Sequence, residues 1–232
     1  MIGVYDYTVV LTYLSMMSGV IGTIVTMTGV GHPDIGVFFL MISGLLDAFD
    51  GRVARTKKGR TQLEKEFGVQ IDSLSDLICF GVLPVAIGIG QLRVSGIFTE
   101  LVPKREYEGN FWFLILLLLI AVIYVLTALI RLAYFNATQA EREEEMEATG
   151  KAYFRGLPVT ASALIFPLVM MVHFYSRLDL TVNYFVVMLT VAFLFVFNIR
   201  IPKPGKIGLT IIIIIGLIEF IGNVHAFTMY IG

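Results

Sequence analysis

Long apolar segments limit the fold of this chain more than any other feature. Residues 111–130 contain no charged side chain, and about twenty apolar residues are enough to cross a bilayer as a helix. Only 15% of the 232 residues are charged and 57% are hydrophobic, whereas soluble domains carry about 25% charged residues. The sequence therefore predicts an all-α, polytopic membrane helix bundle that forms one domain over residues 1–232. We expect seven transmembrane helices, near residues 8–30, 34–54, 70–92, 111–138, 158–176, 181–199 and 207–229.

The basic residues predict the orientation of this bundle, because cytoplasmic connections carry an excess of Lys and Arg. Thirteen of the seventeen Lys and Arg residues fall in the connections after the second, fourth and sixth spans. This distribution places the N-terminus in the cytoplasm and the C-terminus outside, in a multi-pass protein of the cell membrane. Residues 93–110 are expected to form an external loop. No cleavable signal peptide is expected, because a basic region is absent from the N-terminus.

The remaining composition narrows the possible chemistry. The single cysteine, Cys79, lies in an apolar segment and predicts neither a disulfide framework nor a zinc site. The three histidines are scattered and form no ligand pattern. No feature of the sequence implies a nucleic-acid partner.

Four aspartates flank the polar connection between the second and third apolar segments. Asp47 and Asp50 are three residues apart, and Asp72 and Asp76 are four apart, so on a helix each pair shares one face. Carboxylates in a loop are ordinarily just solvated, but these adjoin apolar segments, where ionisable residues are costly and indicate function. A cluster of such charges requires a cation, and carboxylate oxygens suit Mg²⁺, Mn²⁺ or Ca²⁺. The spacing therefore predicts a divalent-metal site.

This stretch resembles the signature of the CDP-alcohol phosphotransferase family, D-x-x-D-G-x-x-A-R followed by a spacer and G-x-x-x-D-x-x-x-D. The spacer here has twelve residues, which is longer than is usual in the family, and one helical turn or a small loop would absorb the difference. The matching residues are Asp47, Asp50, Gly51, Ala54, Arg55, Gly68, Asp72 and Asp76.

The resemblance implies transfer of a phosphatidyl group from a CDP-linked lipid, such as CDP-diacylglycerol, to an alcohol, with release of CMP. It implies two Mg²⁺ or Mn²⁺ ions, which would align the attacking and leaving oxygens, and it suggests a homodimer. Asp76 is expected to be the general base for the acceptor hydroxyl and a further metal ligand. The expected metal ligands are Asp47, Asp50, Asp72 and Asp76. The residues expected to bind the CDP-lipid are Thr12, Gly51, Ala54, Arg55 and Gly68.

A stripe of small residues in the first span has two interpretations. Thr12, Ser15 and Gly19 lie on one helical face, and they match in part a family motif in this region. Small residues of this kind let membrane helices approach closely, or they contact the substrate. Both interpretations stay open at the level of sequence.

The acceptor alcohol is predicted from three further resemblances, all to phosphatidylserine synthases. These are the segments around Arg131, around Arg155 and from Asp72 to Asp76. They imply L-serine as acceptor, with phosphatidylserine as product and with Arg131 and Arg155 as candidates to bind the serine carboxylate. An alternative is another transferase of the family, whose glycerol phosphate or inositol phosphate acceptor would need more cationic side chains. A divalent-cation transporter is disfavoured, because its carboxylates should lie near the bilayer midplane.

Overall fold

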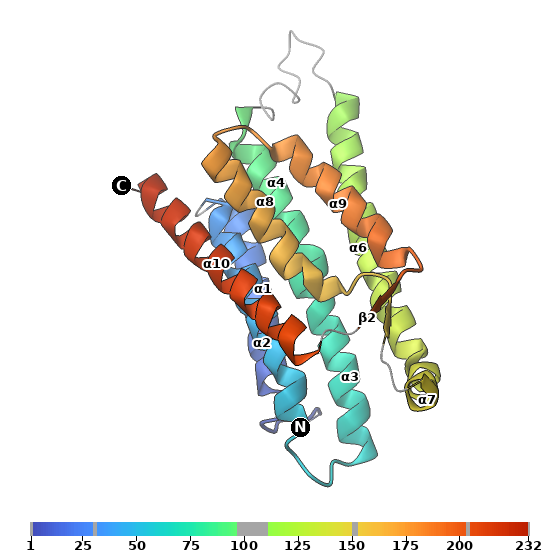
Figure 1. Ribbon diagram of the computed structural model, residues 1–232. Coiled ribbons are helices and arrows are strands. Elements are labelled where there is room, and N and C mark those ends of the chain that lie inside the picture. The colour runs from blue at the N-terminus through green and yellow to red at the C-terminus, as the bar shows by residue number, and fades with distance from the viewer. Residues whose placement is uncertain (1, 30–31, 97–110, 150–152, 203–204, 232) are drawn as a thin grey trace.

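The computed structural model describes residues 2–29, 32–96, 111–149, 153–202 and 205–231. Long helices run side by side in one bundle, and a short antiparallel ladder pairs β1 with β2 (Figure 1). The first half contains α1 (Val10–Thr28), α2 (Asp34–Ala54), α3 (Gln62–Asp76), the π-helical turn η1 (Leu77–Val82) and α4 (Leu83–Val94). The second half contains α6 (Phe111–Ala137), α7 (Gln139–Thr149), β1 (Tyr153–Arg155), η2 (Val159–Ala161), α8 (Ser162–Ser176), α9 (Thr181–Val196), β2 (Arg200–Pro202) and α10 (Lys206–Ile231).

The all-α polytopic bundle expected from the sequence is confirmed. Within the described residues, five helices are long and apolar enough to cross a membrane: Val10–Thr28, Gln62–Val94, Phe111–Ala137, Val159–Ser176 and Thr210–Met229. The predicted spans 34–54 and 181–199 correspond to α2, which carries several aspartates, and to α9, which has only 16 residues. The two chain ends lie at opposite ends of the bundle (Figure 1), as an odd number of crossings requires. The count of seven and the orientation stay predictions, and residues 97–110 of the expected external loop lie outside the described residues.

The third predicted span begins earlier than expected. Instead of starting near residue 70, the helix runs from Gln62 to Val94 through α3, η1 and α4. A capping box starts it: Thr61 Oγ1 accepts a hydrogen bond from the Glu64 amide at 3.2 Å, and a Glu64 carboxylate oxygen accepts one from the Thr61 amide at 2.8 Å. The preceding turn uses Gly59 at a φ of 74°. The long spacer is therefore divided between this turn and the first turns of α3.

The first helix packs closely on its neighbours through small residues. Ser15 and Ser43 exchange hydroxyl-to-carbonyl hydrogen bonds of 3.2 and 3.1 Å between α1 and α2. A Cβ on Gly19 would lie 2.6 Å from Cys79 Sγ and 3.1 Å from Cys79 Cα. The packing interpretation of the small-residue stripe therefore holds for Ser15 and Gly19.

Replacing Gly19 with alanine is expected to destabilise the bundle by about 1–3 kcal/mol, because the new methyl group overpacks the contact with Cys79. Gly216→Ala is the matched control, since its Cβ would meet only a Leu164 methyl at 3.4 Å. Both variants gain about the same helix propensity, so the difference between their stability changes reports the clash at Gly19 alone. Thermal unfolding in detergent measures it, and equal unfolding temperatures for the two variants would contradict the packing argument.

Candidate active site

Three carboxylates meet where the end of α2 lies against α3. Oxygen atoms of Asp47, Asp50 and Asp72 all lie within 4.8 Å of one another. Asp50 is only 8% exposed, so bulk water cannot fully screen the repulsion among these groups. A set of hard oxygen ligands with this charge fits Mg²⁺ or Mn²⁺. The fold therefore brings together three of the four residues that the sequence predicts as metal ligands.

Asp76 lies one helical turn beyond Asp72 and has a different position in the cluster. Its carboxyl group is buried, contacts that of Asp47 and lines the same cavity. It is not part of the three-carboxylate set that could share one ion. Asp76 therefore lies beside the potential metal position and not within it.

Thr12 connects the first helix to this cluster. Its hydroxyl donates a hydrogen bond to Asp50 Oδ2 at 2.9 Å, and the Ser75 hydroxyl donates to the Thr12 carbonyl at 3.3 Å. Thr12 also lines the cavity. It differs in this respect from Ser15 and Gly19, because its side chain orients a candidate metal ligand.

A cavity of about 590 Å³ opens beside the carboxylates, between α1, α2, α3, α6 and α7. Every residue that the sequence assigned to the CDP-lipid lines it: Thr12, Gly51, Ala54, Arg55 and Gly68. Arg55 Nε donates to the Gly51 carbonyl at 2.8 Å, so the two residues share a face as expected. A Cβ on Gly51 would meet nothing closer than the Arg55 guanidinium at 3.6 Å. The backbone at Gly51 is therefore open to a ligand.

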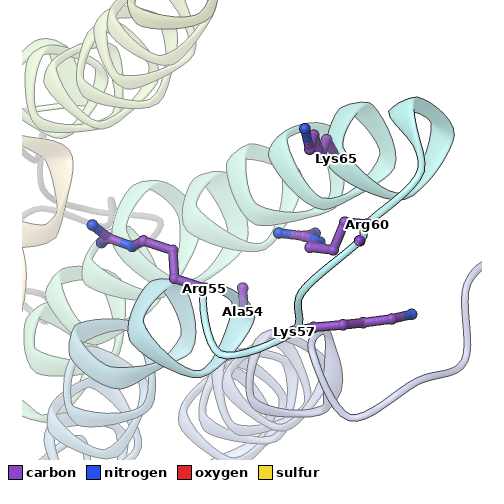
Figure 2. Close-up of a pocket in the computed structure, with 6 residues that line it drawn as sticks. Ala54, Arg55, Lys57, Arg60 and Lys65 are labelled. Atoms are coloured by element: carbon purple, nitrogen blue, oxygen red, sulfur yellow. The ribbon is translucent and has the colours of Figure 1, made fainter.

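Arg60 is a site residue that the sequence interpretation missed. In the sequence Arg60 counts only among the basic residues of the connections, but it lines both the main cavity and an adjoining cavity of about 420 Å³. Its guanidinium donates to the Glu64 carbonyl at 2.9 Å and would be 2.8 Å from a Cβ on Gly68. Arg55 and Arg60 extend toward the same side of the connection, whereas Lys57 extends the other way (Figure 2).

Lys57 fastens the N-terminal segment to the connection between α2 and α3. Its ammonium group lies 2.5 Å from an Asp6 oxygen and 2.7 Å from a Glu64 oxygen. The hydrogen bond from Lys57 is the main reason that the pKa of Asp6 is lowered to about 2. Lys57 is therefore neutralised by two carboxylates, and its role at this position is structural.

The two arginines predicted to bind the acceptor do not line the cavity. Arg131 is 5% exposed and lies 5.1 Å from the centre of the Phe135 ring. Arg155 pairs with Glu145 at 3.3 Å, and its hydrogen bonds to Tyr134 and Glu145 raise its pKa. The expected direct contact of these two residues with a ligand in the cavity is therefore not seen.

Arg142, on α7, is an arginine that lines the cavity near Arg131 and Arg155. It lies 3.5 Å from the centre of the Phe135 ring, so Phe135 contacts both Arg142 and Arg131. Most of the described residues between 141 and 147 are exposed, as an acidic stretch of sequence suggests. They belong to α7, a separate helix whose Arg142 and Met146 form part of the cavity wall.

Comparison with known proteins identifies the family. Residues 8–197 match the sequence pattern of the CDP-alcohol phosphatidyltransferase family. This chain belongs to that family. The match covers α1 to α9 and includes the whole carboxylate cluster, so the cavity described above is the candidate active site of a family member.

Three relatives carry names of serine-using enzymes. The chain is 35% identical to the CDP-diacylglycerol–serine O-phosphatidyltransferase of Saccharomyces cerevisiae over 66% of this chain and 50% of the relative. It is 27% identical to the archaetidylserine synthase of Methanothermobacter thermautotrophicus, over 85% of this chain and 70% of that protein. It is also 26% identical to a CDP-diacylglycerol–serine O-phosphatidyltransferase of Methanocaldococcus jannaschii, over 80% of this chain and 73% of that protein. The chain thus spans half the length of the yeast relative and more of the two archaeal ones.

Proposed function

We propose that this protein transfers the phosphatidyl group of a CDP-linked lipid to L-serine, which gives phosphatidylserine and CMP. The observation that carries the proposal is the set of three clustered carboxylates with Asp76 beside them, next to a cavity that is lined by every signature residue except Asp47. The serine-using relatives support this choice of acceptor. Residues 1–232 act as a single domain in this proposal.

Asp47, Asp50 and Asp72 would hold the Mg²⁺ or Mn²⁺ ions, and the resemblance to the family suggests two of them. When bound, the ions supply charge neutralisation for the pyrophosphate of the donor and for the departing CMP. The three carboxylates keep their positions through their helices and, at Asp50, through the hydrogen bond from Thr12. Such outer contacts typically fix the orientation of a ligand.

Asp76 would accept the proton of the serine hydroxyl as that oxygen attacks phosphorus. An aspartate has an ordinary pKa of about 3.9 and is a weak base for an alcohol. The burial of Asp76 and its place on the cavity wall supply the proximity that such a base needs. No covalent intermediate is required.

The CDP-lipid would lie along the signature face of α2 and α3. Gly51, Ala54 and Gly68 provide space for the nucleotide, and Arg55 provides a guanidinium for phosphate oxygens. We add Arg60 to this group, because its guanidinium covers Gly68 and lies in the same cavity. The lipid tails must remain in the bilayer, so the nucleotide extends toward the connection between α2 and α3.

We propose that Arg142 binds the carboxylate of the acceptor. Arg131, which does not line the cavity, would support it through their shared contact with Phe135. Both guanidinium groups contact Phe135, which itself lines the cavity. Arg155 has a supporting role through its pairing with Glu145 on α7. A phosphate-bearing acceptor such as glycerol phosphate or inositol phosphate remains the second candidate, because Arg60 and Lys65 add positive charge to the cavity.

The acceptor is decided by a panel assay. Purified protein would receive CDP-diacylglycerol and Mn²⁺ with serine, glycerol phosphate or inositol phosphate, and CMP release would be measured for each. We expect serine alone to give rapid release. Equal or faster release with a phosphate-bearing alcohol would replace serine as the proposed acceptor.

We further propose that the protein lies in the cell membrane as a homodimer with its active site in the cytoplasm. The basic bias of the connections supports this orientation. Asp47 and Asp50 lie in the last turns of α2, and the connection from α2 to α3 lies at the same end of the bundle as the N-terminus (Figure 1). This position supports a site at the membrane surface over a cation transporter.

Cysteine labelling tests the orientation. A cysteine at Lys58, which is exposed in the connection after α2, should react with an impermeant reagent only from the cytoplasmic side. A cysteine at Arg177, exposed in the turn between α8 and α9, should react only from outside. Cys79 is buried and provides little background. The reverse labelling pattern would place the active site away from cytoplasmic CMP and overturn the orientation.

A further inference from the structure

The helix that carries Asp72 and Asp76 changes its register immediately after Asp76. In η1 the Leu83 amide donates to the Ile78 carbonyl, five residues back instead of four. One additional residue in a helical turn rotates the preceding segment by about 100° relative to the following one. The π-helical turn therefore decides which face of α3 points toward α2 once α4 is packed in the bundle.

A proline next to this turn leaves a backbone carbonyl without its helical donor. Pro84 has no amide hydrogen, so it cannot donate to the preceding turn, neither to the Cys79 carbonyl in the π-helical register nor to the Phe80 carbonyl in the α-helical one. Phe80 is fully buried, and an unpaired buried carbonyl is costly. The Tyr124 hydroxyl, from α6, donates to this carbonyl at 2.7 Å. With that hydrogen committed, Ser162 of α8 donates to the Tyr124 oxygen at 2.8 Å.

We propose that Tyr124 is a positioning residue for the active site. Its hydroxyl replaces the missing Pro84 amide, stabilises the π-helical turn and so keeps Asp72 and Asp76 directed at the carboxylates of α2. Tyr124 itself lies in the apolar core, away from the cavity wall, so it acts through the backbone of η1. This inference rests on the proposed function, because it takes the carboxylate cluster to be a metal site.

The ring of Tyr124 is held independently of its hydroxyl. It makes an edge-to-face contact with Phe166 at 5.6 Å and a tilted contact with Phe195 at 5.5 Å. Tyr124→Phe keeps these contacts and removes only the oxygen. The variant should therefore fold, with the loss confined to the turn.

Tyr184, on α9, offers a matched control because its hydroxyl also donates to a carbonyl of the helix that carries Asp72 and Asp76. It is as deeply buried as Tyr124, and its hydroxyl donates to the Pro84 carbonyl at 2.8 Å. That carbonyl has the Gly88 amide as its ordinary helical donor, and it lies beyond the π-helical turn. Tyr184→Phe therefore removes a buried hydroxyl without leaving a carbonyl unpaired beside Asp76.

The test measures Mn²⁺ binding to the purified full-length protein, from the electron paramagnetic resonance signal of free Mn²⁺ and without any lipid substrate. Tyr124→Phe should weaken Mn²⁺ binding about 10–100-fold, the usual effect of losing a contact that orients a metal ligand. Tyr184→Phe should leave it unchanged. Adding Pro84→Ala to Tyr124→Phe restores a backbone amide hydrogen at the end of the π-helical turn, which can satisfy the carbonyl that Tyr124 no longer reaches, and should recover the affinity.

Amide hydrogen exchange of residues 77–83 gives a second measurement, and it should accelerate in Tyr124→Phe but not in Tyr184→Phe. Unchanged Mn²⁺ affinity in Tyr124→Phe, or equal losses in the two phenylalanine variants, would overturn the inference while leaving the proposed function intact. A double variant that fails to recover, although Pro84→Ala alone binds Mn²⁺ normally, would also overturn it. Absence of Mn²⁺ binding by the unaltered protein would instead remove the metal site on which the proposed function depends.

Discussion

Asp76→Asn is expected to lower the rate of CMP release by about 10²–10⁴-fold, the usual effect of losing a general base. Asp76 is outside the three-carboxylate set, which would still hold a metal ion in the variant. The amide side chain cannot accept the serine proton. CDP-lipid affinity should change little, because Arg55 and the other cavity residues are intact. Single-turnover CMP release and direct CDP-lipid binding measure the two effects separately.

Arg55→Ala is the complementary variant. It removes a charge-assisted contact with the donor phosphates, worth about 1.5–3 kcal/mol, so it should weaken CDP-lipid binding more than it slows the chemical step. If Asp76→Asn loses donor binding as severely as a variant of Asp50 does, Asp76 is mainly a metal ligand and its assignment as the base is wrong.

Asp50→Asn is expected to lower activity by more than about 100-fold, since removal of a mere orienting partner already costs about 10–100-fold. Asp50 is the most constrained of the three carboxylates, being buried and hydrogen-bonded by Thr12. The loss should be partly reversed by raising the Mn²⁺ concentration, because the defect is one of metal affinity. A Mn²⁺ titration of CMP release at saturating CDP-lipid and serine measures it.

Two variants provide controls for Asp50→Asn. Thr12→Ala removes only the orienting hydrogen bond and should shift the Mn²⁺ titration in the same direction by a smaller amount. Asp34→Asn makes the same chemical change at the other end of α2, where Asp34 pairs with His32 at 2.8 Å, and should have no effect on the titration. Similar titrations for Asp50→Asn and Asp34→Asn would contradict a metal site at Asp50.

The carboxylate cluster was predictable because its geometry is local. The spacing of Asp47 and Asp50, and of Asp72 and Asp76, fixes each pair on one helical face, and the apolar segments on both sides force the two helices to pack together. Apolar length likewise predicted the helix bundle. A spacing rule could not reveal the π-helical turn after Asp76, which changes the register of the helix and depends on Tyr124 from a different span.

The positions of the arginines depend on tertiary structure, and here the sequence was less informative. Arg60 enters the cavity because the turn at Gly59 directs it onto Gly68, and no periodic pattern encodes that approach. Arg131 is predicted from the sequence to bind the acceptor, yet it does not line the cavity and contacts the Phe135 ring. Arg142 lies in an acidic stretch that suggests a solvated helix, and only the packing of α7 against α6 brings it to the cavity.

Metal- and serine-dependent CMP release by the purified protein tests the central claim most directly. The assay contains CDP-diacylglycerol, serine and Mn²⁺, and it is repeated without serine and with excess EDTA. The account predicts rapid release in the complete mixture, release near the background rate when serine is omitted, and complete loss with EDTA that is restored by added Mn²⁺. Full activity in excess EDTA, or release that is independent of serine, would contradict it.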